Sequence, residues 1–374
     1  MNYFKNYSKY LLDWIKLYRY IATVKEKKTI TFYSEGRQYW LCYKGIIDEI
    51  LKLGHTIYYV SSDNSDPGLN YSSKIISLSI DERYQRFIFF RTLETTIFIT
   101  TTPDLGNYKD YPKSKKTDYF IYCQHALMST HYAYNDKAFD NFDVIFCSGE
   151  YMIKEIRKKE SVIGLKQKKL VKHGYSKLDF MIKEFKNLDD ADKNQHIIFA
   201  PGWNGLHSLI ENGSAEEYIE KILIQGHKLF FKPHPESLKR SNKEIDKIID
   251  KFKHNDNFVF YKDTLSIDIV LRSSFLITDW SGISIEYAFA TGNIVFYIDT
   301  PQKCVNMNSN ELNLEAFESQ IRNKIGYIWD GKSILSSDFE KINSTSLMKE
   351  NIYNILNSDK VAAEFINNLL IEKE

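Results

Sequence analysis

Short apolar segments alternate with helix-like segments along almost the whole chain. The first half holds such segments at 29–35, 55–62, 95–105, 117–127 and 142–150. Turn-forming residues bound each segment, and the helical stretch from Gln38 to Leu53 ends at Gly54. Strands that alternate with helices pair in parallel, because each crossover helix returns the chain to the same edge of the sheet. The pattern therefore predicts an α/β fold built on parallel sheets.

The pattern restarts after a charged stretch at 181–195, where we place a linker between two domains. A chain of 374 residues is long enough for two domains of ordinary size. We predict two doubly wound parallel-sheet domains, at 29–185 and 186–345, with a cleft between them. Helices at 346–374 are expected to pack at the domain junction. Strands of the second domain are expected at 196–203, 228–235, 257–262, 274–280 and 293–299.

Composition excludes several classes of protein. The formal net charge of +1 gives no field that would attract nucleic acid. The four cysteines lie far apart, which argues against a zinc site or a disulfide framework and fits a reducing cytosol. No apolar run reaches the roughly 20 residues that span a bilayer, and no signal peptide is visible. A cytoplasmic protein is therefore expected.

Residues 1–28 differ in character from the rest of the chain. Aromatic and aliphatic residues recur there at helical spacing, and lysines and arginines outnumber acidic residues on the other positions. Such a basic amphipathic helix can lie in a membrane interface, which would place the protein on the inner face of the cell membrane. The alternative is a helix that packs on the first domain, with its lysines in solvent.

Two polar loops follow predicted strands of the second domain. KPHPE at 232–236 places Lys232 and His234 just past a strand, and the prolines restrict the orientation of the imidazole. TDWSGISIE at 278–286 places a serine hydroxyl and backbone amides at the start of a helix, where anions bind. Ligands of open α/β sheets bind beyond the strand ends, so the two loops predict a nucleotide-diphosphate site. The second loop contributes Asp279, Ser281, Gly282, Ile283 and Glu286.

Each of these residues also has a purely structural interpretation. His234 could cap a turn, and Asp279 could cap the helix that follows it. Glu286 is expected to accept hydrogen bonds from ribose hydroxyls, and Gly174, in a turn before the linker, is expected to lie near the donor. The loop SSDNSDPG at 61–68 has the wrong spacing for a metal-binding carboxylate pair. Neither a metal ion nor a cofactor is predicted.

The first domain supplies candidates for acid–base chemistry. His125 ends a predicted strand, and a histidine there is a candidate general base, because its pKa lies near working pH. A hydrogen-bonded structural histidine is the competing interpretation. Ser129 and His131 follow in the chain, and Glu35 and Arg37 close the first strand. We expect these four residues on the acceptor side of the site.

In these motifs the chain resembles the CDP-glycerol glycerophosphotransferase family, which makes teichoic acids and related surface glycans. The resemblance covers roughly 115–300 and rests on CQHAL, CSGEYM, HGYSKLD, KPHPES and TDWSGISIEYAF. It implies a GT-B architecture of two Rossmann-like domains, with His125 as the base and His234 on the diphosphate. Two departures stand out, because Ala126 replaces the glycine of the family's HG element and Gly282 replaces the second serine of its Ser-Ser pair.

The resemblance implies an enzyme that transfers glycerol phosphate, or another polyol phosphate, from a CDP-linked donor. The acceptor would be a hydroxyl of a surface glycan or of its lipid-linked precursor, and CMP would leave. Two alternatives stay open: a GT-B glycosyltransferase that uses a nucleotide sugar, and a non-catalytic protein that binds nucleotides or glycans. No nucleic-acid partner is expected.

Overall fold

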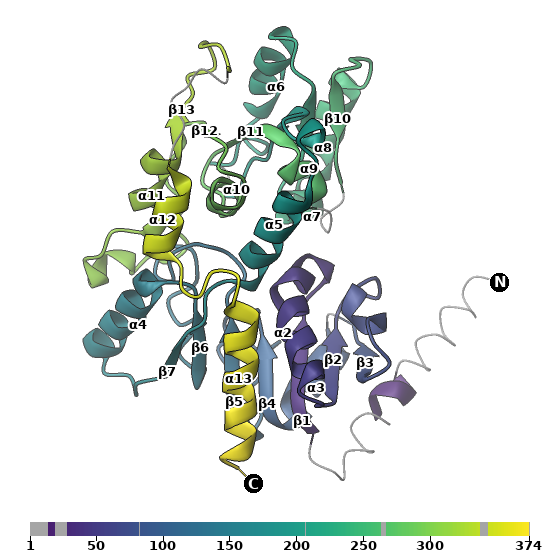
Figure 1. The fold of residues 1–374 in the computed structure, drawn as a ribbon, viewed down its shortest axis with the longest axis vertical. Coiled ribbons are helices and arrows are strands. Elements are labelled where there is room, and N and C mark those ends of the chain that lie inside the picture. Colours follow the sequence, from purple (N-terminus) through teal and green to yellow (C-terminus); the bar gives the residue numbers. More distant parts are fainter. Residues whose placement is uncertain are drawn as a thin grey trace, which may run out of the picture. The chain divides into compact units, whose positions relative to one another are not determined.

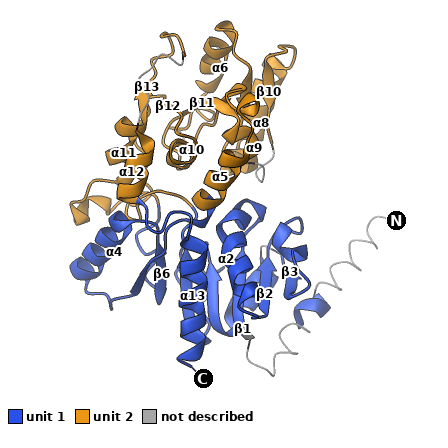
Figure 2. Cartoon of the chain, viewed as in Figure 1, with its two compact units in different colours: residues 1–125, 134–177, 352–374 blue, residues 126–133, 178–351 orange. Residues whose placement is uncertain are grey.

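The computed structural model describes residues 14–18, 28–81, 83–205, 207–262, 267–336 and 343–373. The chain divides into two compact units (Figure 2). Unit 1 comprises residues 1–125, 134–177 and 352–374, and unit 2 comprises residues 126–133 and 178–351. The predicted amphipathic helix at 1–28 lies mostly outside the described residues.

Unit 1 is built on a seven-stranded sheet with the order β3-β2-β1-β4-β5-β6-β7 (Figure 1). All neighbouring strands are parallel. Helix α13 packs against α2. The strands are β1 (Lys28–Ser34), β2 (Ile57–Ser61), β3 (Ile75–Ser79), β4 (Glu94–Thr100), β5 (Lys116–Cys123), β6 (Val144–Cys147) and β7 (Lys169–Lys172). The helices are η1 (Arg37–Tyr39), α2 (Trp40–Lys52), η2 (Pro67–Asn70), α3 (Tyr84–Thr92), α4 (Glu150–Ile163) and α13 (Ser358–Ile371).

Unit 2 is built on a six-stranded parallel sheet with the order β10-β9-β8-β11-β12-β13. Its strands are β8 (His196–Phe199), β9 (Leu229–Phe231), β10 (Phe258–Phe260), β11 (Ser273–Thr278), β12 (Val295–Tyr297) and β13 (Gly326–Ile328). Its helices are α6 (Ala215–Ile224), α7 (Pro235–Arg240), α8 (Asn242–Phe252), α9 (Asp268–Leu271), α10 (Ile283–Thr291), α11 (Phe317–Ile325) and α12 (Ser344–Asn351), with η3 (Asp190–Asp192) and η4 (Ser309–Leu312). Helix α5 (Ser176–Asn187) begins in unit 1 and continues in unit 2.

Apolar strands form the centre of both units, as expected for sheets that are covered on both faces. In unit 1, Ile30 and Phe32 of β1 and Ile97 and Phe98 of β4 have no exposed surface. In unit 2, one apolar cluster joins strands β8, β9 and β11 to helices α6 and α8. The predicted fold class, two doubly wound parallel sheets, is confirmed.

Unit 2 also contains residues 126–133, which lie between two strands of unit 1 in the sequence. The N–H of Val305 donates to the carbonyl of Tyr132 at 2.8 Å. The N–H and hydroxyl of Ser129 both donate to the Glu318 carboxylate of α11, at 2.9 and 2.7 Å. The chain therefore leaves unit 1 directly after His125, and its next residues are fixed to unit 2.

The structure differs from the sequence-based expectation in two connecting regions. Residues 181–187, expected in a linker, belong to helix α5, because Leu178, Met181 and Ile182 form a buried apolar face among the charged residues. The amphipathic stretch at 346–371 forms two helices, α12 in unit 2 and α13 in unit 1. The domain limits 29–185 and 186–345 stay a prediction.

Among the described residues, no helix is both long enough and apolar enough to cross a bilayer.

Candidate active site

The sheet of unit 2 changes direction between β8 and β11. From β8 the strand order runs to β9 and β10 on one side and to β11, β12 and β13 on the other. Loops from the two sides diverge at such a point, and the crevice outside the carboxyl ends of the strands is where open α/β sheets bind ligands. Both polar motifs predicted from the sequence follow strands at this edge, KPHPE after β9 and DWSG after β11.

Asp279 joins the two sides of this point. It follows β11, is only 2% exposed, and its Oδ1 accepts a hydrogen bond from the N–H of Gly202, after β8, at 2.7 Å. Burial raises the pKa of the carboxyl, while the N–H of Gly202 and the charge of Lys303 oppose that shift. A side chain at Gly202 would collide with this carboxylate, since an added Cβ would lie 2.7 Å from Oδ1. Asp279 thus orients the loops that form the site.

Helix α10 begins at this edge of the sheet. Gly282 is its N-cap residue and Ile283 its first residue, so their N–H groups have no partner within the helix. The carbonyl of Ser281 accepts from the N–H and the hydroxyl of Ser284, at 3.1 and 2.8 Å, which fixes the turn. Glu286, one turn further along α10, is 2% exposed. The helix start therefore offers backbone donors to an anion.

His234 follows β9 and caps helix α7. Its Nδ1 accepts from the N–H of Glu236 at 3.1 Å, so Nδ1 carries a lone pair. Burial, and then the charges of nearby Lys303 and Lys232, lower the pKa of the imidazole to about 3. The ring is therefore neutral at physiological pH, and its proton is on Nε2. His234 can donate a hydrogen bond through Nε2 without carrying a charge.

Lysine 303 is a site residue that the sequence motifs do not reveal. It lies in the loop after β12, outside KPHPE and DWSG. Burial lowers the pKa of its ammonium group, which interacts with the carboxylates of Asp279, Glu318 and Glu236. Its Nζ also lies 5.9 Å from the centre of the Trp203 ring. A half-buried ammonium group beside His234 can supply positive charge to a phosphate at this edge of the sheet.

Trp203, in the loop after β8, is a second residue of this edge that the sequence analysis did not predict. The guanidinium carbon of Arg240 lies 5.4 Å from the centre of its ring, within reach of a cation–π interaction. Arg240 and Lys303 therefore both place positive charge near the Trp203 ring. The polar edge of unit 2 is therefore lined by an aromatic ring and cations in addition to the predicted residues.

His125 lies in unit 1, just beyond β5. Its Nδ1 forms a 3.0 Å hydrogen bond with the hydroxyl of Tyr122. The rings of Tyr39 and Tyr134 meet the imidazole edge to face, with centroids 5.3 and 5.6 Å away. The residue is half-buried. Three tyrosines from different parts of unit 1 thus fix the ring of the predicted base.

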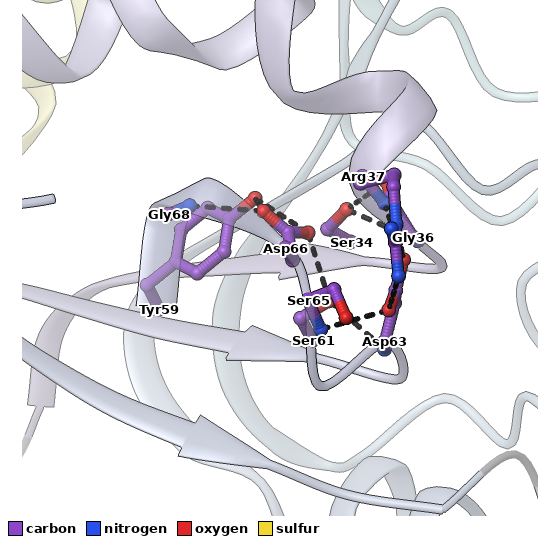
Figure 3. Close-up of polar contacts among 9 residues, drawn as sticks. All are labelled: Ser34, Gly36, Arg37, Tyr59, Ser61, Asp63, Ser65, Asp66 and Gly68. Atoms are coloured by element: carbon purple, nitrogen blue, oxygen red, sulfur yellow. Dashed lines mark hydrogen bonds and ion pairs between the residues drawn. The ribbon is translucent and has the colours of Figure 1, made fainter. Parts of the chain in front are cut away.

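Glu35 and Arg37 follow β1 at the same edge of unit 1. The hydroxyl of Tyr111 donates to Glu35 Oε1, and the guanidinium of Arg86 lies 4.6 Å from the centre of the Tyr111 ring. Arg37 binds Asp63 through Nε and Nη2, at 2.6 and 2.8 Å (Figure 3). This pairing holds the pKa of Asp63 at about 2.

A second carboxylate organises the loop after β2. Asp66 is 2% exposed and accepts from the hydroxyls of Tyr59 and Ser61 and from the N–H of Gly68 (Figure 3). An added Cβ at Gly68 would lie 2.4 Å from the Tyr59 ring, so glycine is required there. Asp66 thus fixes the loop that carries Asp63 and, through it, Arg37.

The sheet of unit 1 has its own change of direction, between β1 and β4. The side chain of Tyr43, in α2, occupies the crevice at this point of the sheet. Its hydroxyl donates to the carbonyl of Tyr33 at 2.8 Å and accepts from the N–H of Thr101 at 2.6 Å. The ring is fully buried. The two units therefore differ at equivalent points: a tyrosine occupies the crevice in unit 1, whereas polar loops surround it in unit 2.

The remaining predicted residues have clear structural partners. Ser129 and His131, expected on the acceptor side, belong to unit 2, where Ser129 binds Glu318 and Nε2 of His131 lies 3.0 Å from the carbonyl of Leu314. Gly174 adopts φ +99°, and an added Cβ would lie 2.4 Å from the carbonyl oxygen of Tyr353. Its conformation and packing require glycine, and a role for it at the donor stays a prediction.

In the part of the chain that the structure describes, no group of three or more His, Cys, Asp or Glu residues is placed to hold a metal ion.

Solved structures with the same fold include two functional classes. A variant of the wall teichoic acid polymerase TagF matches with a TM-score of 0.60 and 14% identity, over 92% of this chain and 90% of that chain. UDP-GlcNAc 2-epimerase from Methanocaldococcus jannaschii, in complex with UDP-GlcNAc and UDP, matches with a TM-score of 0.59 and 12% identity. This match covers 92% of this chain and 99% of that chain. Both have GT-B-like folds, and at these identities the likeness shows the fold alone.

Sequence comparisons give the family. No curated protein matches the chain significantly. A family model described as CDP-Glycerol:Poly(glycerophosphate) glycerophosphotransferase matches residues 17–304, which is well over half of the chain. The resemblance found in the sequence motifs is therefore confirmed, and the chain belongs to the CDP-glycerol:poly(glycerophosphate) glycerophosphotransferase family.

Proposed function

We propose that the chain transfers glycerol phosphate, or a related polyol phosphate, from a CDP-linked donor to a hydroxyl of a surface glycan or of its lipid-linked precursor. Family membership supports the reaction class. The observation that carries the proposal is the chemistry at the edge of unit 2. A neutral His234 with its proton on Nε2, a half-buried Lys303 and the start of α10 together suit a diphosphate.

The transfer step balances without a metal or a cofactor. The acceptor oxygen attacks the distal phosphorus of the donor, and a new P–O bond forms to the acceptor. The bond between that phosphorus and the bridging oxygen breaks, and CMP leaves with the bridging oxygen. The proton of the acceptor hydroxyl passes to His125, which acts as general base.

The residues of unit 2 would stabilise charge on the diphosphate. Nε2 of His234 donates to a phosphate oxygen, while Lys232 and Lys303 supply positive charge. The N–H groups of Gly282 and Ile283 and the Ser281 hydroxyl complete the anion site. Removing one such donor typically costs about 3 kcal/mol of transition-state stabilisation, or roughly a hundredfold in rate. Glu286 is assigned to the ribose hydroxyls, as the sequence predicts.

Location follows from the substrates. A CDP-linked donor is a cytoplasmic metabolite class, and a lipid-linked acceptor would be reached at the inner face of the membrane. Residues 1–28 would supply the membrane contact through their basic amphipathic pattern.

A donor panel tests the reaction. Purified protein is incubated with a bacterial membrane extract and CDP-glycerol, CDP-ribitol or UDP-GlcNAc, and nucleotide and acceptor products are identified by mass spectrometry. We expect CMP and an acceptor heavier by a polyol phosphate. Release of UDP with transfer of a sugar would establish the glycosyltransferase alternative instead. Binding of a donor without turnover on any acceptor would establish a non-catalytic binding protein.

Variants connect the reaction to the site. His234→Ala is expected to reduce CMP release at least about a hundredfold, while the protein still folds. His254→Ala is the matched control, because this exposed histidine lies in unit 2 away from the polar loops. Near-normal activity of His234→Ala would remove the assigned site.

A further inference from the structure

Arg322, on helix α11, is a buried cation outside the motifs that predict the donor site. It is 5% exposed, and its Nη2 donates to the carbonyl of Ile298 at 3.2 Å. Its ion pair with Asp299 is long, at 4.0 Å from Nη2 to Oδ1, and that carboxylate is 78% exposed. Nε of Arg322 is buried without a hydrogen-bond partner in the described part of the chain. These few polar contacts do not replace the lost water around a guanidinium, so other groups must hold the charge.

Two aromatic rings hold the guanidinium of Arg322. Its carbon lies 4.1 Å from the centre of the Trp280 ring and 4.6 Å from the centre of the Tyr297 ring. Cation–π contacts at such distances are worth more where water is excluded. Tyr297 is the last residue of β12 and is 2% exposed, whereas Trp280 is half-buried in the loop after β11. Arg322 therefore ties the indole of this loop to the sheet.

Trp280 is the residue of the DWSG loop to which the proposed function gives no role. Its Nε1–H donates to the carbonyl of Thr300 at 2.8 Å, so a hydrogen bond fixes one edge of the indole while the guanidinium covers a face. Asp279, directly before it, binds the N–H of Gly202. Ser281, directly after it, carries the hydroxyl assigned to the diphosphate. The indole thus anchors the loop between these two residues.

We propose that Arg322 is a positioning residue of the donor site: by stacking on Trp280, it holds the DWSG loop so that the Ser281 hydroxyl and the first N–H groups of α10 face the diphosphate before the donor binds. Groups that are fixed in advance need not be ordered when the ligand arrives, which raises affinity. This inference rests on the proposed function for its ligand, whereas the contact between guanidinium and indole is a property of the folded chain.

Arg322→Lys separates the stack from the charge. Lysine keeps the positive charge, but its compact ammonium group cannot stack as the flat guanidinium does. Trp280→Leu removes the other half of the contact and serves as the second variant if Arg322→Lys does not fold. Arg272→Lys is the matched control. This arginine of unit 2 lies directly before β11, at the opposite end of the strand from the DWSG loop.

Amide hydrogen exchange without any donor tests the contact itself. In Arg322→Lys, we expect exchange across residues 279–288 to be about tenfold faster or more, because the loop and the first turns of α10 lose the stack that holds them closed. Trp280→Leu should give the same local change, and exchange in α8 should stay at the wild-type rate in both variants. Wild-type exchange across 279–288 in either variant would overturn the proposal.

Affinity for CDP, measured by titration calorimetry, tests the effect on the ligand. We expect a loss of about tenfold or more in Arg322→Lys and in Trp280→Leu, and no further loss when the two are combined, because both residues act through one contact. Arg272→Lys should keep the wild-type affinity. Wild-type affinity in Arg322→Lys together with a loss in Arg322→Met would show that the charge alone acts, and would overturn the positioning role.

Kinetics exclude a purely structural role for Arg322. With CDP-glycerol, Arg322→Lys should raise KM about tenfold, because the loop no longer presents its groups to the donor. A residue that only supports the fold would lower the amount of folded enzyme and therefore the apparent kcat, with KM unchanged, and that result would overturn the inference. If the wild-type protein does not bind CDP, the proposed function fails, while the exchange experiment still decides whether Arg322 holds the loop.

Discussion

Ala126 and Gly282 lie against each other within unit 2. A Cβ added at Gly282 would lie 3.3 Å from the methyl carbon of Ala126 and 3.3 Å from Cγ of Met128, closer than side chains normally approach. These are the two positions at which the sequence departs from its family's motifs. The methyl group of Ala126 and the side chain of Met128 both border the space that a side chain at 282 would need. Glycine at 282 leaves backbone amides where the family's motif has a serine hydroxyl.

The steric coupling predicts a double-mutant result. Gly282→Ala should lower the Tm by about 2–4 °C, because overpacking a filled contact costs on the order of 1 kcal/mol or more. Backbone strain does not contribute, since Gly282 has φ −59°. In an Ala126→Gly background, Gly282→Ala should lower the Tm by a clearly smaller amount. Equal Tm losses in the two backgrounds would show that Met128, and not Ala126, limits the space.

His234 should make stability depend on pH. Its folded-state pKa of about 3 lies below the ordinary value of 6.5, so the unfolded chain binds a proton that the folded chain does not. The contribution of the unprotonated His234 to the free energy of unfolding is complete above about pH 6.5. It is lost as the pH falls toward about 3. We expect His234→Asn to show a smaller fall in Tm between about pH 6.5 and pH 4.5 than the wild-type protein. His254→Asn, at an exposed position, should keep the wild-type slope.

Lys303 should matter for donor binding although no motif includes it. Replacing it by methionine removes a half-buried positive charge that acts on Asp279 and His234. We expect the affinity for CDP, measured by titration calorimetry, to fall about tenfold or more, which corresponds to about 1.4 kcal/mol. Lys243→Met, on the exposed face of α8, is the matched control. Wild-type affinity in Lys303→Met would place the diphosphate elsewhere.

The two carboxylates of Figure 3 should differ in their effect on stability. Asp66→Ala leaves the Tyr59 and Ser61 hydroxyls and the Gly68 N–H without their acceptor, in a buried place, and should cost about 3 kcal/mol. Asp63→Ala breaks a partly exposed pair with Arg37 and should cost less than about 1 kcal/mol. Urea unfolding measures both. A larger loss for Asp63→Ala would reverse the assignment of the buried carboxylate as the loop's anchor.

Sequence reasoning predicted the central strands and both polar loops of unit 2. Strands β9 and β11 are apolar runs that end in unusual polar residues, and parallel strands bring such ends to one edge. It missed β3, β7 and β13, which lie at the edges of their sheets. Strand β13 has three residues, and β7 has two apolar residues between two lysines, so neither resembles a buried strand.

The site was predicted less completely than the fold. Lys303 and Trp203 stand on loops without a motif, and only the strand order brings them near His234 and Asp279. The tyrosines around His125 come from η1, β5 and the loop after residue 133, and their spacing in the sequence gives no sign of the contact. Ser129 follows His125 by four residues, yet it belongs to the other unit, because its partner Glu318 is far along the chain.

The most direct test of the account is the crystal structure of the His125→Ala variant with CDP-glycerol, which lacks the proposed base and should hold the donor intact. The measured quantities are the distances from the diphosphate oxygens to Nε2 of His234, Nζ of Lys303 and the N–H of Ile283. We expect hydrogen-bond distances of about 2.7–3.2 Å, with the distal phosphorus facing residue 125. A donor bound away from these groups, or a distal phosphorus remote from residue 125, would contradict the proposed reaction.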